Sequence, residues 1–207
     1  ADAFTAEAAI LARSPDGAGA MTIGPAGENT AVQACVKVDK WRSLGRGGMG
    51  AVLGSKRIKG IAFAGTQPCE VADPDLLKRI VKEIAAKGKA SPGTKGYQDH
   101  GTIMQVSATN GQKCFPTHYW SAGVFDDWKT LSANYMHDHF EVKRNGCPNC
   151  FLQCTKSARV KAGRHEGLEL DGPEFETVYA IGGLNGIRGL EEVAWLNVLC
   201  DKLGLDT

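Results

Sequence analysis

The chain has 207 residues, of which 43% are hydrophobic, and this composition suffices for a buried core in one or two domains. A formal net charge of +1 gives no overall basic field, so we expect no nucleic-acid partner. No hydrophobic run reaches the roughly 20 residues that a membrane-spanning helix needs, and the N-terminal stretch does not resemble a signal peptide. We therefore expect no membrane association.

The cysteine content and the two ends of the sequence also limit the possibilities. The chain has seven cysteines, an odd number, and three of them lie within eight residues. This spacing is typical of a metal cluster in a reducing cytoplasm, not of a disulfide framework. The sequence starts without Met and stops directly after a strong helical pattern, so we expect an internal fragment of a longer polypeptide.

The first third of the chain is predicted to contain β-strands. A short helical pattern ends at Pro15, and it is followed by a brief strand and a Gly/Pro turn over 19–29. Apolar residues alternate from Val32 to Val38, which favours another strand. After a glycine-rich stretch, a third apolar β-run extends over 58–64.

The remainder is predicted to be mainly helical. Asp73 as N-cap and Pro74 at the first helical position begin an amphipathic helix over 73–90. We predict an irregular, functional loop over 91–125, and helical patterns resume at 126–140 and from Glu174 onward. We therefore expect an α+β protein with one β-containing domain over 1–66 and a mainly helical domain over 67–207.

The strongest motif is the C-x2-C-x3-C run of Cys147, Cys150 and Cys154. Soft thiolates select zinc or an iron–sulfur cluster, and both normally take four protein ligands. The spacing favours an iron–sulfur cluster. A zinc site with His165 as the fourth ligand, or cysteines without a metal, are the alternatives.

Three further motifs have both a structural and a functional interpretation. The glycines of "GRGGMGAVLG" let the backbone and Arg46 approach an anion, or they form a tight turn between closely packed segments. Glu174 and Glu176 stabilise a helix N-terminus, or one of them transfers a proton from an apolar pocket. "CDKLGLD", with Gly204 as the residue after the helix, is a C-terminal helix cap.

Taken in order, these motifs resemble the aldehyde:ferredoxin oxidoreductase family of tungsten-pterin enzymes. The resemblance covers essentially the whole chain. It rests on five stretches, which are "IGPAGEN", "GRGGMGAVLGSKRIKGIAF", the C-x2-C-x3-C run, "DGPEFETVYAIGGLNGI" and "LCDKLGLDT". It implies that residues 1–66 are the end of an N-terminal pterin-binding domain and that residues 67–207 are a truncated helical domain that binds the cluster and the pterin.

The resemblance also implies the cofactors and their ligands. The family holds tungsten, or sometimes molybdenum, between the dithiolenes of two pterins whose phosphates can be bridged by Mg²⁺, beside one [4Fe–4S] cluster. Three cluster ligands would be Cys147, Cys150 and Cys154, while the fourth cysteine of the family lies beyond this chain. The residues expected at the pterins and their phosphates are Arg46, Gly47, Gly48, Gly50, Ala51, Asp201, Gly204, Leu205 and Asp206.

The implied reaction is oxidation of a small aldehyde to its carboxylate, with electrons leaving through the cluster to ferredoxin or another electron-transfer subunit. Glu176 matches the family's proton-transfer glutamate, whose histidine partner also lies beyond this chain. The chain reads Trp195 to Val198 where some members carry an E-x-x-H intersubunit metal site, so the expected oligomer would be held otherwise. The fragment alone should be inactive.

Two other functions remain open. Within the same family, the metal could serve the reduction of an activated aromatic acid in a larger complex. From another class, the chain could be a zinc-stabilised binding module that uses the three clustered cysteines and His165. The basic stretch 156–164 could dock an acidic ferredoxin, although a merely solvated face is the commoner explanation.

Overall fold

The computed structural model describes residues 1–206 and contains both helices and antiparallel sheets, which confirms the predicted α+β class. The chain forms two compact units. The first comprises residues 1–68 together with the C-terminal residues from Asn197 onward, and the second comprises residues 69–196. The end of the chain, which the sequence assigns to the second domain, thus packs in the first unit. No helix of residues 1–206 is long and apolar enough to cross a membrane.

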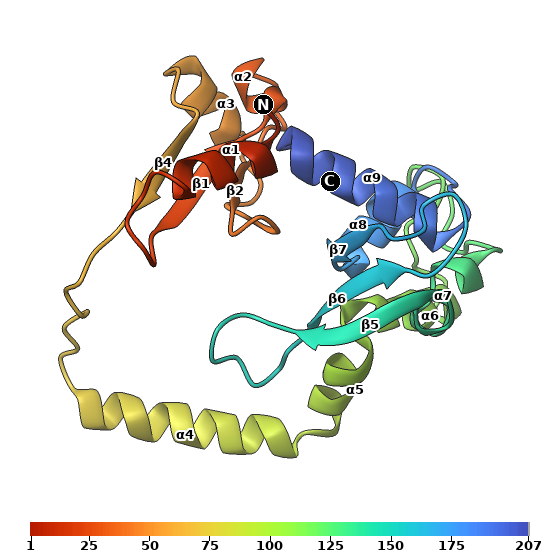
Figure 1. Ribbon diagram of the computed structural model, residues 1–207. Helices are drawn as coiled ribbons and strands as arrows, with labels where there is room; N and C mark the ends of the chain where they lie inside the picture. Colours follow the sequence, from red (N-terminus) through yellow and green to blue (C-terminus); the bar gives the residue numbers. More distant parts are fainter. Residues whose placement is uncertain (207) are drawn as a thin grey trace. The chain divides into compact units, whose positions relative to one another are not determined.

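The first unit is built on a four-stranded antiparallel sheet with the order β3-β2-β1-β4 (Figure 1). Its strands are β1 (Gly19–Ile23), β2 (Val36–Val38), β3 (Arg42–Ser43) and β4 (Gly60–Phe63). Its helices are α1 (Ala3–Leu11), α2 (Pro25–Glu28) and α3 (Met49–Ser55), together with the end of α9 (Leu190–Leu203). The side chain of Asp2 caps α1 by accepting a hydrogen bond from the Thr5 amide at 2.8 Å, and α1 packs on β1 and β4.

Glycines allow close packing of α2 on α3 in this unit. A Cβ at Gly54 would overlap the carbonyl oxygen of Gly27, and a Cβ at Gly27 would lie 2.9 Å from the carbonyl oxygen of Gly50. Part of the glycine-rich stretch therefore serves helix packing, which is the structural interpretation left open by the sequence.

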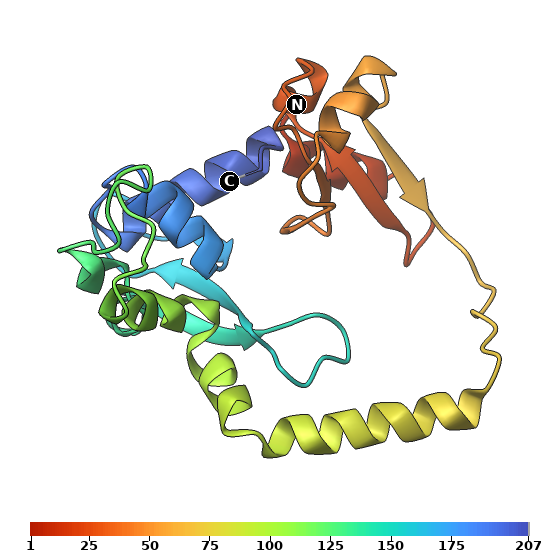
Figure 2. The ribbon, with the colours of Figure 1, turned by 180° about the vertical axis from the view of Figure 1, so that it is seen from behind.

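The second unit combines helices with a three-stranded antiparallel sheet in the order β5-β6-β7. Figure 2 shows the β5–β6 hairpin of this sheet from behind. The strands are β5 (Phe140–Asn145), β6 (Thr155–Val160) and β7 (Glu169–Asp171). The helices are α4 (Pro74–Ala90), α5 (Pro92–His100), α6 (Gln105–Gly111), α7 (Ala133–His139), α8 (Phe175–Thr177) and α9 (Leu190–Leu203), with 3₁₀ turns η1 (Thr102–Met104) and η2 (Trp128–Leu131) and the π-helix η3 (Val178–Gly183).

Two segments of this unit differ from the sequence-based expectation. The stretch 91–125 contains α5, η1 and α6, so it is not one long irregular loop. The β5–β6 hairpin was not predicted. The helical pattern of 126–140 includes the first residue of β5, and in β6 the adjacent residues Thr155 and Lys156 are both buried. Two polar residues facing the interior remove the alternation that identifies a strand.

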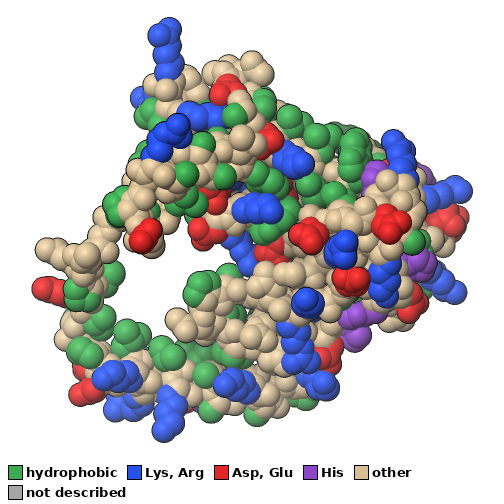
Figure 3. Space-filling view, viewed as in Figure 1, with side chains coloured by type: hydrophobic (Ala, Val, Ile, Leu, Met, Phe, Trp, Pro, Cys, Tyr) green, Lys and Arg blue, Asp and Glu red, His purple; other side chains and the backbone are tan. Residues whose placement is uncertain are grey.

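The predicted amphipathic helix is confirmed as α4. Asp73 caps it by accepting a hydrogen bond from the Leu76 amide at 2.8 Å. Hydrophobic side chains gather along one side of α4 and Lys and Arg side chains along the other (Figure 3). None of its residues is buried.

Candidate functional site

The C-terminal motif and the glycine-rich stretch meet within the first unit. The segment after α9 pairs with the segment that precedes β2, because the Cys35 amide donates to the Gly204 carbonyl at 2.8 Å and the Asp206 amide donates to the Gln33 carbonyl at 3.0 Å. Leu205 forms an antiparallel bridge with Ala34. On the other side, the Gly50 amide donates to the Ala34 carbonyl at 3.0 Å. Residues 33–35 therefore join two segments that are far apart in sequence.

Two glycines are required at this junction. Gly204 has φ +72°, and a Cβ there would lie 2.7 Å from the Gly24 amide nitrogen. A Cβ at Gly50 would lie 2.6 Å from the Cys35 carbonyl oxygen. Any larger residue would separate the two segments.

Asp201 is fixed by a buried lysine that the sequence did not indicate. Lys37 has an exposed fraction of 1%, and its Nζ lies 2.5 Å from Asp201 Oδ1 and 2.7 Å from Ser43 Oγ. The Asn197 side-chain amide donates to Asp201 Oδ2 at 2.8 Å. Because both carboxylate oxygens are engaged, Asp201 is held in one orientation.

Arg46 lies on the exposed glycine loop and contacts the C-terminal motif. Its Nε lies 2.6 Å from Asp206 Oδ2. Gly47 has φ +124°, and a Cβ there would meet open space. Gly48, with φ +73°, is the N-cap of α3, and its carbonyl accepts a hydrogen bond from the Ala51 amide at 3.0 Å. Within residues 1–206, no backbone acceptor engages the amides of Gly47 or Gly48. These amides and the guanidinium are suited to an anion.

Two further cysteines, Cys35 and Cys200, flank this junction. Burial raises the pKa of the Cys35 thiol and of the Cys200 thiol, so both remain protonated and weakly reactive at neutral pH.

The three clustered cysteines lie on the loop 146–154 that joins β5 to β6. Cys147 is exposed, and Cys150 and Cys154 are half-buried free thiols. The Cys150 amide donates to the Cys147 carbonyl at 3.0 Å, which forms a turn between the first two. Across the described part of the chain, no three His, Cys, Asp or Glu side chains form a metal-holding group, so this ligand set stays a prediction.

The cysteine loop is anchored on α4 and α5 by residues that the sequence did not single out. The ring of Phe151 lies against Gly88 of α4, where any side chain would overlap it. Gln98 Nε2 donates to the Phe151 carbonyl at 2.8 Å, and Lys156 Nζ donates to the Gln153 carbonyl at 3.0 Å. The loop is therefore held at its centre and at its end.

Glu176 lies in α8, after the cis Gly172-Pro173 peptide, and its side chain is exposed. The neighbouring Glu174 accepts a hydrogen bond from the Thr102 hydroxyl, which also accepts from the Phe175 amide at 2.9 Å. Residues 1–206 thus do not form the apolar pocket that a proton-transfer role for Glu176 would need. The assignment stays a prediction.

His165 cannot complete a zinc site with the clustered cysteines. It lies in the turn after β6, whereas Cys154 precedes β6, and a strand of six residues separates them by about 20 Å. Its ring stacks on Trp195, and Nε2 lies 3.0 Å from Glu192 Oε2 without hydrogen-bond geometry. The structure thereby contradicts the zinc ligand set that the sequence left open.

Comparison with known proteins gives consistent matches along the chain. Residues 1–65 match the family described as "Aldehyde ferredoxin oxidoreductase, N-terminal domain", and residues 79–207 match "Aldehyde ferredoxin oxidoreductase, domains 2 & 3". The tungsten-containing aldehyde ferredoxin oxidoreductases of Pyrococcus furiosus and Thermococcus kodakarensis are each 34% identical over 187 residues, which cover 90% of this chain and 30% of the relative. The chain thus spans about 30% of the length of these curated relatives.

Two further matches are more distant, one in sequence and one in structure. A Pyrococcus furiosus protein described as "Aliphatic sulfonate oxidoreductase, WOR-like subunit" is 27% identical over 186 residues, or 89% of this chain and 29% of that protein. The solved active site complex BamBC of benzoyl coenzyme A reductase has a TM-score of 0.68 at 20% identity, covering 99% of this chain and 32% of its own. With both of its halves matched, this chain belongs to the aldehyde ferredoxin oxidoreductase family.

Proposed function

We propose that this chain is part of a tungsten- or molybdenum-dependent enzyme that oxidises a small aldehyde to its carboxylate and delivers the electrons to ferredoxin or another electron-transfer subunit. Curated relatives of that name at 34% identity support the proposal. The main structural support for this proposal is the contact between the glycine loop and the C-terminal motif. Both segments are expected to bind the same pterin cofactor, and the fold brings them together.

The residues at this junction fit a phosphate-bearing pterin. The unengaged amides of Gly47 and Gly48 and the guanidinium of Arg46 can bind phosphate oxygens, and Mg²⁺ could bridge such phosphates. Asp201 and Asp206 supply carboxylates that can accept hydrogen bonds from pterin ring nitrogens. Lys37 would orient Asp201 for this contact without touching the cofactor. Gly50, Ala51, Gly204 and Leu205 would contribute backbone close to it.

The donor set of the cysteine loop fits an iron–sulfur cluster. Three reduced thiols on one short loop are soft donors, and Phe151 adds an apolar wall. We propose Cys147, Cys150 and Cys154 as three ligands of a [4Fe–4S] cluster, with the fourth supplied from outside residues 1–206. The predicted division at residue 66 and the cytoplasmic location likewise remain proposals.

When bound, the metal–pterin centre would supply the two-electron redox chemistry. Conversion of an aldehyde and water into a carboxylate releases two electrons and three protons. We assign Glu176 as the base that accepts one of these protons, because it stands at the glutamate position of the "DGPEFET" motif by which the chain resembles the family; the apolar surroundings that this role requires would come from outside residues 1–206.

Aldehyde-dependent reduction of a dye by the anaerobically purified natural protein tests the proposal. Glu176→Gln should lower turnover by roughly 10²–10⁴-fold while iron and tungsten contents stay unchanged. Glu166→Gln, a change at another exposed carboxylate, is the matched control and should retain full activity.

Two outcomes would contradict this assignment. Near-full activity of Glu176→Gln would remove Glu176 from the reaction. Absence of aldehyde oxidation together with reduction of an activated aromatic acid would replace the proposed reaction by the alternative within the family.

A further inference from the structure

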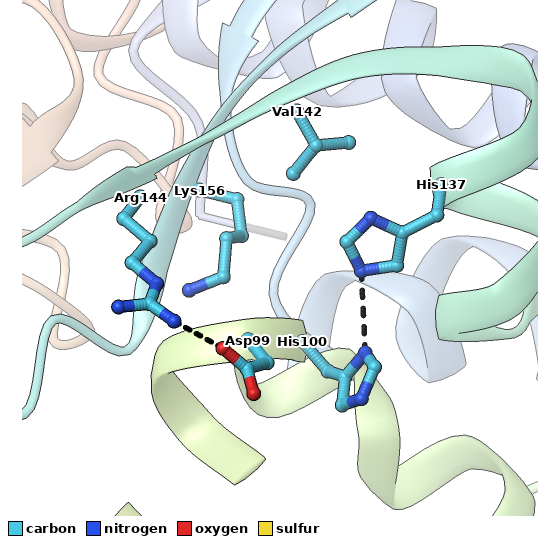
Figure 4. Close-up of a pocket in the computed structure, with 6 residues that line it drawn as sticks. All are labelled: Asp99, His100, His137, Val142, Arg144 and Lys156. Atoms are coloured by element: carbon cyan, nitrogen blue, oxygen red, sulfur yellow. Dashed lines mark hydrogen bonds and ion pairs between the residues drawn. The ribbon is translucent and has the colours of Figure 1, made fainter. Parts of the chain in front are cut away.

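A buried lysine lies directly behind the last cysteine of the cysteine loop. Lys156 belongs to β6, two residues after Cys154, and its exposed fraction is 3%. Its side chain extends from β6 toward the end of α5, in the pocket shown in Figure 4. Lysine is almost never fully buried unless it is paired, because taking its charge out of water is costly. The burial of Lys156 therefore needs a compensating interaction.

Three carbonyl groups hold the ammonium group of Lys156 in place. Lys156 Nζ donates to the carbonyl of Tyr97, in α5, at 2.9 Å. It also donates to the carbonyls of Gln153 and Thr155, both at 3.0 Å. Three acceptors require three N–H donors, which only the charged ammonium form of lysine has. The geometry therefore keeps a positive charge at this position.

The same hydrogen bonds bracket Cys154. Gln153 and Thr155 are its two neighbours in the chain, so the ammonium group binds the carbonyl groups of the residues before and after it. Gly101, which follows α5, allows this approach. A Cβ there would lie 2.7 Å from the Cys154 carbonyl oxygen and 3.3 Å from Lys156 Cγ. Lys156 thereby fixes the backbone of Cys154 against the end of α5.

The charges around Lys156 include the thiol of Cys154 itself. Burial lowers the pKa of Lys156, and the negative charges of Glu174 and of a Cys154 thiolate oppose that shift. Arg144 and Asp99, which pair with each other, have smaller and opposite effects. A thiolate at Cys154 and the ammonium group of Lys156 therefore stabilise each other.

We propose that Lys156 is a positioning residue of the iron–sulfur cluster, an inference that rests on the cluster ligands proposed above. It fixes the backbone that carries the Cys154 thiolate, and its positive charge stabilises the negative charge that the cluster and its thiolates gain with one added electron. In turnover that electron would come from the aldehyde, and no bond at Lys156 forms or breaks. Lys156 thus raises the reduction potential of the cluster.

A redox titration of the anaerobically purified natural protein, followed by the EPR signal of the reduced cluster, tests this proposal. Lys156→Gln removes the charge but keeps two N–H donors for the three carbonyls, so the fold should be retained. Lys156→Arg keeps the charge. Lys143→Gln is the matched control, since Lys143 is an exposed lysine on the neighbouring strand β5, opposite Ser157. The iron content of each variant is measured alongside.

Lys156→Gln should disfavour the reduced cluster about tenfold or more, which lowers the potential of a one-electron couple by about 59 mV or more. Lys143→Gln should leave the potential unchanged, because the charge of an exposed lysine is screened by solvent. Lys156→Arg should stay near the unmodified protein. A tenfold effect in Lys156→Arg would overturn the proposal, even if Lys156→Gln does not fold.

The iron content separates this inference from the proposed function. Absence of iron from the unmodified protein would contradict the cluster itself. Equal potentials of Lys156→Gln and Lys143→Gln, each with about four irons per chain, would overturn only the role of Lys156. Loss of iron from a folded Lys156→Gln, with full iron in Lys143→Gln, would support the positioning of Cys154.

Discussion

Replacing Lys37 by Met should strongly destabilise the first unit. The change removes the ammonium group that lies 2.5 Å from Asp201 Oδ1 and leaves a carboxylate with an exposed fraction of only 13% without that cation. Breaking one partner of a buried ion pair costs about 3–5 kcal/mol, because the remaining charge is poorly solvated. The free energy of unfolding should fall by that amount.

Urea denaturation followed by circular dichroism measures this loss. With about 1–3 kcal/mol per M for the dependence on urea, the midpoint of the first unit should fall by about 1–5 M. Lys59→Met is the control, since Lys59 pairs with Glu28 at 3.0 Å on a partly exposed surface, and such pairs contribute about 0–1 kcal/mol. The double change Lys37→Met with Asp201→Leu should recover much of the loss. Equal midpoints for Lys37→Met and Lys59→Met would refute the reasoning.

Three further changes probe other parts of the structure. Gly54→Ala should lower the free energy of unfolding by about 1–3 kcal/mol in urea, because its methyl group overlaps the backbone of α2, while Gly65→Ala, with open space around it, should be nearly neutral. Gly88→Ala should displace the Phe151 ring and raise the alkylation rate of the cysteine loop by iodoacetamide several-fold, and an unchanged rate would show that the ring does not hold the loop. Burial lowers the pKa of His137 in the folded state, so the unfolded chain binds a proton more readily and the folded state should lose stability as pH falls below about 6.5. Thermal unfolding between pH 7.5 and 5 measures this loss, which should be smaller in His137→Gln.

Local signals in the sequence predicted the helices, strands and motifs that depend only on residues close to one another in the chain. The Asp73–Pro74 start and the helical spacing of α4 identified that helix. Alternation over 32–38 identified the segment that contains β2, and an apolar run over 58–64 identified β4, whereas β3 was not predicted. The spacing of the cysteines singled out their loop as a candidate site. In each case the determining residues lie within a few positions of one another.

Contacts between distant segments could not be predicted in this way. Lys37 and Asp201 are 164 residues apart, and a lone lysine in a β-pattern gives no sign that it will be buried against a helix end. His100 and His137 likewise meet only because α5 packs near α7. The hairpin around the cysteine loop was missed because buried polar residues hide its alternation.

The most direct test of the proposed function is metal analysis of the natural protein that carries this sequence, purified without oxygen. Tungsten or molybdenum together with about four irons per chain is the predicted result, because we propose that the three cysteines of one loop bind the cluster and that the glycine loop binds the pterin phosphate. A single zinc without iron, tungsten or molybdenum would contradict it.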